Sequence, residues 1–179
     1  TLNLTVLIEG FYNPASNLMT SDTVRVFLRN SNSPYSIIDS TKSTLSSSGT
    51  GIFTFSFPVS GVNYFIVTKH RNSIETWSKT AQAFTGGSLT YSFSTVNTQA
   101  YGNNMKQIDV SPVRFGFYSG DVNQDGTVDA TDVSMLDNDA AIFASGYVIS
   151  DLTGDNFVDG TDFAIADNNA ANFMSVIRP

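Results

Sequence analysis

Residues 121–132 read Asp-Val-Asn-Gln-Asp-Gly-Thr-Val-Asp-Ala-Thr-Asp, and residues 151–162 read Asp-Leu-Thr-Gly-Asp-Asn-Phe-Val-Asp-Gly-Thr-Asp. The two stretches are offset by thirty residues and share Asp at their first, fifth, ninth and twelfth positions. The match continues downstream, where Phe143 returns as Phe173. The repeated unit is therefore a loop followed by a helix, and two copies of it predict a pseudo-twofold arrangement.

Oxygen-bearing side chains recur at alternate positions of each stretch, which is the pattern that a calcium loop requires. Ca²⁺ takes about six to eight oxygen ligands, and a loop supplies them from roughly positions 1, 3, 5, 7, 9 and 12. The expected ligands of the first loop are Asp121, Asn123, Asp125, the carbonyl of Thr127, Asp129 through a water, and Asp132. Those of the second loop are Asp151, Thr153, Asp155, the carbonyl of Phe157, Asp159 and Asp162. The sequence thus predicts two calcium sites, and Mg²⁺ is disfavoured because it keeps most of its waters.

The second loop departs from the first at two positions, and both departures predict weaker binding. Thr153 places a neutral hydroxyl where the first loop has an amide, and Asn156 replaces Gly126 at a position that favours a left-handed backbone. Val128 and Val158 occupy the eighth position of their loops, where an apolar residue is expected to pair one loop with the other through a short β contact.

A helix is predicted after each loop, over residues 131–144 and 161–175. Asp132 and Asp162 fall near the helix starts, where a carboxylate complements the positive end of the helix dipole. The residues expected on one apolar face are Val133, Leu136, Ala140 and Phe143 in the first helix and Phe163, Ala166, Ala170 and Phe173 in the second.

Residues 1–118 have the pattern of an all-β domain. Short runs of β-branched and aromatic residues alternate with Gly, Pro, Ser and Asn clusters, which is typical of an antiparallel, Ig-like sandwich. Phe53, Phe55 and Phe57 alternate with polar residues, so one aromatic face is expected to be buried between two sheets. The predicted strands are residues 2–8, 23–29, 35–41, 51–57, 64–69, 76–84, 88–93 and about 113–118. We therefore expect two domains, a β-sandwich over 1–118 and a small helical module over 119–179.

The charge is divided unevenly between these two regions. Residues 119–179 hold eleven Asp against one Arg, a formal net of −10, whereas residues 1–118 have a net of +3, which gives −7 for the chain. Nucleic acid is excluded as a partner of the acidic region, which lacks the cations that bind phosphate. There is no Cys, so disulfides and thiolate metal sites are excluded, and no apolar run approaches the roughly 20 residues of a membrane span.

The β region contains the only His and the only Trp of the chain, His70 and Trp77, in one polar stretch. Trp77 is interpreted either as a core residue or as a stacking platform for a sugar ring, which would make the sandwich a carbohydrate-binding domain. Catalysis is disfavoured, because the two Glu residues, Glu9 and Glu75, would have to meet in a cleft that a small sandwich seldom provides. We expect a non-catalytic chain.

The loop-helix repeat, beginning at Gly120-Asp-Val-Asn-Gln-Asp-Gly, resembles the type I dockerin family with its two F-hand calcium motifs. The resemblance covers about sixty residues and implies a secreted or cell-surface bacterial or archaeal protein whose module binds a cohesin in a calcium-dependent way, as in cellulosomes that act on carbohydrates. Members that assemble cellulosomes tend to carry a hydroxyl pair at the loop end and basic residues along the helix. This chain has Ala130-Thr131 and Gly160-Thr161, then Asp137-Asn138 and Asp167-Asn168.

Two other interpretations stay open beside calcium-dependent binding of a cohesin-like protein. The acidic module could dock on its own sandwich, whose charge is opposite, to form a rigid structural element. Carbohydrate binding by the sandwich is the third, and it requires Trp77 to be exposed.

Overall fold

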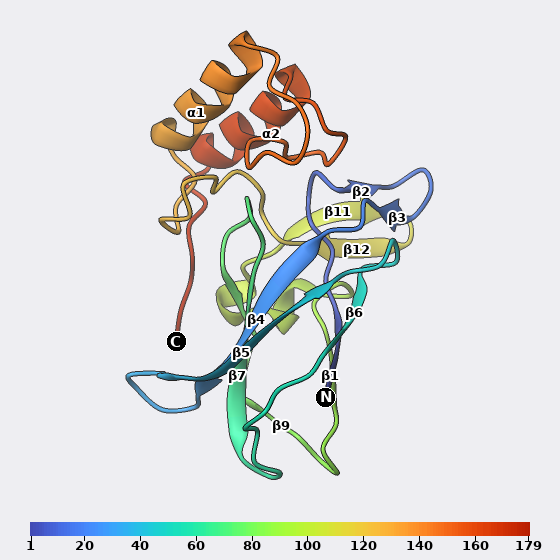
Figure 1. Ribbon diagram of the computed structural model, residues 1–179, viewed down its shortest axis with the longest axis vertical. Helices are drawn as coiled ribbons and strands as arrows, with labels where there is room; N and C mark the ends of the chain where they lie inside the picture. The colour runs from blue at the N-terminus through green and yellow to red at the C-terminus, as the bar shows by residue number, and fades with distance from the viewer.

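The computed structural model describes residues 1–179 and has a β-rich part and a helical part stacked along its long axis (Figure 1). All strands fall between residues 2 and 116, and both α-helices fall between residues 130 and 171. The predicted order, a β module followed by a two-helix module, is confirmed. After the second helix the chain runs back along the β module to its C-terminus (Figure 1).

The larger sheet has five strands, which pair in the order β5-β4-β7-β8 with β9 beside β7. Along β4, Val24, Val26 and Leu28 are buried and alternate with partly exposed neighbours, because successive side chains point to opposite faces of a sheet. The strand β7 lies centrally and is buried on both faces. The bounds are β4 Thr23–Asn30, β5 Ile37–Thr44, β7 Asn63–Lys69, β8 Thr76–Trp77 and β9 Gln82–Ala83.

A three-stranded sheet with the order β10-β1-β6 completes the sandwich. The strand β1 pairs with β6 in antiparallel fashion but with β10 in parallel, so the module is not wholly antiparallel. Two hairpins and two 3₁₀ turns add to these sheets. The bounds are β1 Leu2–Thr5, β6 Thr50–Phe53, β10 Leu89–Ser92, β2 Tyr12–Asn13, β3 Leu18–Met19, β11 Lys106–Val110, β12 Val113–Gly116, η1 Asn97–Gln99 and η2 Tyr101–Asn103.

The main core lies between the two sheets and contains many aromatic side chains, including Phe53 and Phe55. Phe57 was expected on the same buried face but is exposed, because β6 ends at Phe53. Beyond it the backbone N–H groups of Ser56 and Phe57 donate to Oδ2 of Asp39 at 2.7 and 3.0 Å, which turns the chain out of the sheet. The alternating pattern of the sequence therefore continues to Phe57, whereas the strand itself ends at Phe53.

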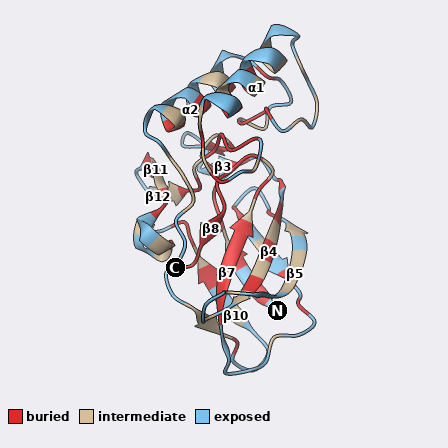
Figure 2. Cartoon of the chain, turned by 90° about the vertical axis from the view of Figure 1, so that its left-hand side faces the viewer, coloured by how far each residue is buried: buried red, intermediate tan, exposed pale blue.

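The two helices, α1 Ala130–Ala141 and α2 Gly160–Ala171, begin with the same capping box. The caps are Asp129 and Asp159, and the reciprocal carboxylates are Asp132 and Asp162. Buried Leu136 and Ala166 form a small core with Val122 and Leu152 of the loops. The outward faces of the two helices are exposed (Figure 2). Neither helix is long and apolar enough to cross a membrane.

Phe143 and Phe173 were expected on the buried helix face, and that prediction is wrong. Both side chains are 85% exposed. Each residue has a positive φ, 53° and 54° respectively, so the helical path ends before the aromatic ring can reach the apolar stripe. The repeat places an exposed aromatic side chain just beyond the C-terminus of each helix.

Candidate metal centre

The first loop is organised around Asp121, whose side chain is completely buried. Its Oδ1 accepts a hydrogen bond from the backbone N–H of Gly126 at 3.3 Å, and Gly126 has a φ of +97° that suits glycine. Its Oδ2 is buried as well and accepts no hydrogen bond. A buried carboxylate oxygen without a donor is unfavourable unless a cation lies beside it.

The next ligand candidates of the first loop hold its backbone in a sequence of tight turns. Oδ1 of Asn123 accepts from the N–H of Asp125 at 2.8 Å, and Oδ1 of Asp125 accepts from the N–H of Thr127 at 2.9 Å. Asp129 caps α1 by accepting from the N–H of Thr131 at 2.7 Å. Asn123 and Asp125 are exposed, so their remaining oxygen lone pairs stay available to a ligand.

Asp132 ties the start of the loop to the start of the helix. Its Oδ1 accepts from the N–H groups of Val122 and Asn123 at 2.9 and 3.1 Å, and its Oδ2 accepts from Asp129 at 3.0 Å. Asp162 makes the equivalent bonds to Leu152, Thr153 and Asp159. A carboxylate has about four acceptor positions, so three bonds leave one free at Oδ2. Asp132 and Asp162 therefore close their loops by accepting hydrogen bonds from backbone N–H groups at both ends of the loop.

Burial controls the acid chemistry of the first loop. It raises the pKa of Asp121 to about 6, and the neighbouring carboxylates of Asp132 and Asp125 act in the same direction against a hydrogen bond from Gly126. Burial also raises the pKa of Asp132 and of Asp162. These are the shifts expected where carboxylates are buried without a counter-ion.

The second loop has the same frame with different partners. Oδ1 of Asp151 accepts from the N–H of Gly154 at 2.7 Å and from the hydroxyl of Thr153 at 3.3 Å. Its Oδ2 accepts from the N–H of Asn156 at 3.2 Å, and Asn156 has the left-handed backbone expected at this position, with a φ of +72°. Asp155 accepts from the N–H of Phe157 at 2.9 Å, and Asp159 accepts from that of Thr161 at 2.7 Å.

The expected β contact between Val128 and Val158 does not form. The N–H of Val128 donates to Met174 at 2.8 Å, and the N–H of Val158 donates to Ala144 at 3.0 Å. Each loop therefore pairs with the segment that follows the other copy's helix, because both chain segments leave their helices toward the opposite loop. Both valines are buried as predicted.

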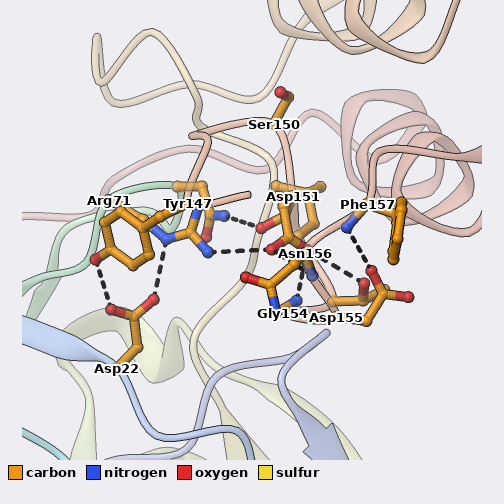
Figure 3. Close-up of polar contacts among 12 residues, drawn as sticks. Asp22, Arg71, Tyr147, Ser150, Asp151, Gly154, Asp155, Asn156 and Phe157 are labelled. Atoms are coloured by element: carbon orange, nitrogen blue, oxygen red, sulfur yellow. Dashed lines mark hydrogen bonds and ion pairs between the residues drawn. The ribbon is translucent and has the colours of Figure 1, made fainter. Parts of the chain in front are cut away.

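The sandwich contributes side chains to the second loop, and sequence reasoning missed this. Nη2 of Arg71 lies 3.4 Å from Oδ2 of Asp151 (Figure 3). The amide of Asn72 donates to the carbonyl of Asp151 at 2.8 Å. Nε of Arg71 pairs with Asp22 at 2.9 Å, and the hydroxyl of Tyr147 donates to the same carboxylate at 2.6 Å. The polar stretch around His70 gave the only sequence signal, and its partners could not be read from it.

Further contacts join α2 and the C-terminal segment to the sandwich. Asn169 donates to Glu9 at 2.7 Å and to the carbonyl of Ser119 at 2.8 Å. A Cβ on Gly10 would lie 2.1 Å from the carbonyl of Leu152, so only glycine permits this close approach. Arg178 pairs with Glu75 at 3.1 Å. The two Glu residues therefore hold the two parts of the chain together, and neither faces the other across a cleft.

Trp77 lies in the interior with 3% of its surface exposed. Its indole N–H donates to Glu75 at 2.8 Å, and its ring packs edge-on against Phe65 and Tyr35 with centroids 5.7 and 6.0 Å away. A stacking platform needs an exposed face. The interpretation of Trp77 as a core residue holds, and the carbohydrate platform does not form.

Carboxylates alone do not make up a metal site in either loop. No group of three or more His, Cys, Asp or Glu side chains converges closely enough to hold a metal ion. A calcium ion would also need the amide of Asn123 in the first loop, or the hydroxyl of Thr153 in the second, together with a main-chain carbonyl. This is the mixed oxygen set that Ca²⁺ accepts. Because Oδ2 of Asp121 is buried without a donor, the first loop fits a cation.

Comparison with known families agrees with this geometry. Residues 119–170 match the family described as dockerin type I domain. Residues 119–170 are a type I dockerin domain. The match covers both loops, α1 and most of α2, and the dockerin module is the part of the chain that carries the candidate metal centre.

Two solved structures resemble the chain over almost its whole length. Both are described as type II cohesin–X–dockerin complexes from Acetivibrio cellulolyticus, one an N-terminal and the other a C-terminal interface mutant. The first has a TM-score of 0.51 at 13% identity and covers 96% of each chain. The second has a TM-score of 0.56 at 12% identity and covers 96% of this chain and 98% of the other. The fold is thus that of an X-module followed by a dockerin. No curated protein matches the sequence.

Proposed function

We propose that the dockerin domain binds two Ca²⁺ ions and, in that state, holds a cohesin-like protein outside the cell. The buried and unpartnered Oδ2 of Asp121, at the first position of a dockerin loop, is the observation that carries the calcium proposal. The proposed ligands of the first loop are Asp121, Asn123, Asp125, the Thr127 carbonyl, Asp129 through a water, and Asp132. Those of the second loop are Asp151, Thr153, Asp155, the Phe157 carbonyl, Asp159 and Asp162.

Calcium would supply the positive charge that the dockerin region lacks. Residues 119–179 have a formal net charge of −10, and two Ca²⁺ would cancel four of these charges. A ligand that binds only the folded state stabilises it by about 2.7 kcal/mol per site at a hundredfold excess over the dissociation constant. The folding of this domain is therefore expected to be linked to calcium.

A cohesin-like partner is supported by the solved structures of similar fold, whose descriptions name a cohesin bound to an X–dockerin pair. The dockerin domain leaves a suitable surface free. Ile142, Phe143 and Phe173 are 74%, 85% and 85% exposed, and the exposed helix starts Thr131 and Thr161 offer hydroxyls. Exposed aromatic side chains rimmed by polar groups are typical of protein interfaces.

The charge of that surface sets an expectation for the partner. Asp137 and Asp167 are exposed on the two helices, and neither helix contains a basic residue. A partner should therefore offer Lys or Arg around apolar pockets. Such a basic binding surface would distinguish the partner from cohesins whose dockerins present basic helix residues.

A second role is favoured by the contacts between the two modules. Arg71, Asn72 and Glu9 of the sandwich bind the dockerin domain directly, at 3.4, 2.8 and 2.7 Å. We propose that the sandwich has no catalytic role and serves as a rigid support for the dockerin domain. This support is compatible with cohesin binding, because α1 and both exposed Phe side chains remain free.

Calcium titration followed by cohesin binding tests the proposal. Chelator-treated protein is titrated with Ca²⁺ by calorimetry, and the loaded and stripped forms are then applied to immobilised, purified type I and type II cohesin domains. We expect two calcium sites and retention on a cohesin that EGTA abolishes. Asp125→Ala and Asp155→Ala, which each remove one proposed ligand, are matched controls and should each lose one site. The absence of calcium binding would refute the proposal, and calcium binding without cohesin binding would leave only the structural role.

A further inference from the structure

Arg71 is placed between the two modules and faces a carboxylate on each side (Figure 3). Its Nε lies 2.9 Å from Oδ2 of Asp22 in the sandwich, and its Nη2 lies 3.4 Å from Oδ2 of Asp151 in the second loop. Its guanidinium also stacks on the ring of Tyr147 at 4.3 Å. Only 11% of the Arg71 side chain is exposed, so the positive charge is held close to the loop.

The corresponding position of the first loop has no such partner. Asp121 and Asp151 both occupy the first position of their loops, and both are buried. Oδ2 of Asp121 accepts no hydrogen bond, whereas Arg71 pairs with Oδ2 of Asp151, the oxygen that also accepts the N–H of Asn156 and so corresponds to Oδ1 of Asp121. No Lys or Arg lies within 4.0 Å of the Asp121 carboxylate, although Lys69 acts on it from farther away. The sandwich thus distinguishes two loops that the repeat makes alike.

The position of Arg71 does not depend on Asp151, because Asp22 also holds its guanidinium. Asp22 is buried and also binds His70 at 3.1 Å and Tyr147 at 2.6 Å, so it forms a fixed anchor for the guanidinium. Burial alone would raise the pKa of Asp22, but the hydrogen bonds from His70, Tyr147 and Arg71 hold that pKa well below its usual range. The bond to Asp151 is the longer of the two that Arg71 makes with carboxylates, so Asp22 is its main anchor.

We infer that Arg71 acts as an internal cation for the second loop and lowers its calcium affinity below that of the first loop. This inference rests on the proposed binding of two calcium ions. Arg71 pairs with the Asp151 oxygen that also accepts the N–H of Asn156, so its positive charge lies beside the first ligand of the loop whichever oxygen of Asp151 holds the ion. Repulsion between a single and a double positive charge a few ångströms apart is worth roughly a tenfold change in affinity, even at the dielectric constant of water.

The consequence is an order of filling. The first loop, with an unpartnered carboxylate oxygen, fills at lower calcium concentration, and the second loop fills at a higher concentration because calcium binds there against the charge of Arg71. Thr153 and Asn156 weaken the second loop from within, whereas Arg71 does so from the neighbouring module. A substitution in the sandwich should therefore change the calcium affinity of the dockerin domain at one loop.

A calcium titration of the full chain, monitored by ¹H–¹⁵N NMR, measures the calcium affinity of each loop separately. The backbone N–H of Gly126 reports on the first loop and that of Asn156 on the second, because each donates to the first Asp of its loop. Arg71→Gln is expected to tighten the second site roughly tenfold and to change the first by less than about twofold. Arg71→Lys keeps the charge and should stay within about threefold of the unaltered protein. Lys79→Gln removes an exposed charge that makes no ion pair and serves as the control.

Each outcome of the titration distinguishes between the two proposals. If the unaltered protein shows no calcium-dependent shift at Gly126 or Asn156, the proposed function fails. If it fills both loops and Arg71→Gln leaves the second affinity unchanged or weaker, the inference about Arg71 is overturned. The indole N–H signal of buried Trp77 checks the fold of the sandwich. Should Arg71→Gln not fold, the pair Asp22→Asn/Arg71→Gln removes both charges together, and it should still tighten the second site.

Discussion

Replacing Asp121 by Asn is expected to stabilise the metal-free protein while weakening its first calcium site. The substitution keeps the shape of the side chain and removes its charge. In the structure Oδ2 of Asp121 is buried without a hydrogen bond, so the ionised form is stabilised only by the bond from Gly126 to Oδ1. In the metal-free state this charge is a cost, and in the loaded state it is a ligand.

The size of the effect follows from the pKa of Asp121, which burial raises from 3.8 to about 6. Each pKa unit corresponds to about 1.36 kcal/mol, which gives an upper value of about 3 kcal/mol at pH 7. We therefore expect a gain of about 1–3 kcal/mol. Because the folded pKa lies above the unfolded one, protonation favours the folded state. The gain is therefore complete above pH 6 and disappears below about pH 4.

Asp151→Asn is the matched control at the equivalent position of the second loop. Asp151 is buried like Asp121 but has Arg71 as a partner, so its loss should destabilise the metal-free protein by about 1 kcal/mol. Urea unfolding of stripped protein at pH 7 and pH 3.5 measures both variants, and calcium titration measures the lost site. The reasoning is refuted if Asp121→Asn is no more stable than the parent at pH 7, or if its gain persists at pH 3.5.

Three further predictions concern stability and partner binding. Asn156→Gly should raise the unfolding free energy by about 0.5–1 kcal/mol in thermal melts, because Asn156 has a φ of +72°; a lower melting temperature would contradict this. Leu136→Ala should cost about 2–5 kcal/mol in urea unfolding, since Leu136 is completely buried between the helices and loops; a loss below 1 kcal/mol would show that this small core contributes little. Phe143→Ala combined with Phe173→Ala should leave stability within about 0.5 kcal/mol but weaken cohesin binding in surface plasmon resonance; unchanged binding would exclude this surface.

Sequence reasoning succeeded where the information is local. The positions of Asp121 and Asp151 in their loops follow from spacing, and the placement of Asp132 at the helix start follows from the same twelve residues. Both predicted helices exist, although the first ends at Ala141 and not at residue 144, and the second ends at Ala171 and not at residue 175. Phe143 has a positive φ without being Gly or Asn, so the residue type gave no stop signal.

Contacts between distant segments could not be predicted in this way. Arg71 and Asp151 are eighty positions apart, and nothing in either local sequence identifies the other as its partner. The predicted contact between Val128 and Val158 failed for the same reason, because the partner of Val128 is Met174, which lies beyond the end of the second helix. The hairpin β2–β3 was missed because each of its strands has only two residues, and β11 was missed because it buries Asp109 and exposes Val110, against the usual pattern.

The contact with the sandwich gives a physical reason for one difference between the two copies of the repeat. Asp139 in α1 becomes Asn169 in α2. Asp139 faces its own module, where the hydroxyl of Ser150 donates to it. Asn169 is buried against the sandwich and donates to the Glu9 carboxylate at 2.7 Å and to the Ser119 carbonyl at 2.8 Å. An ionised Asp at this position could donate neither bond and would repel Glu9, so the second copy can dock on the sandwich only with a donor such as Asn at position 169.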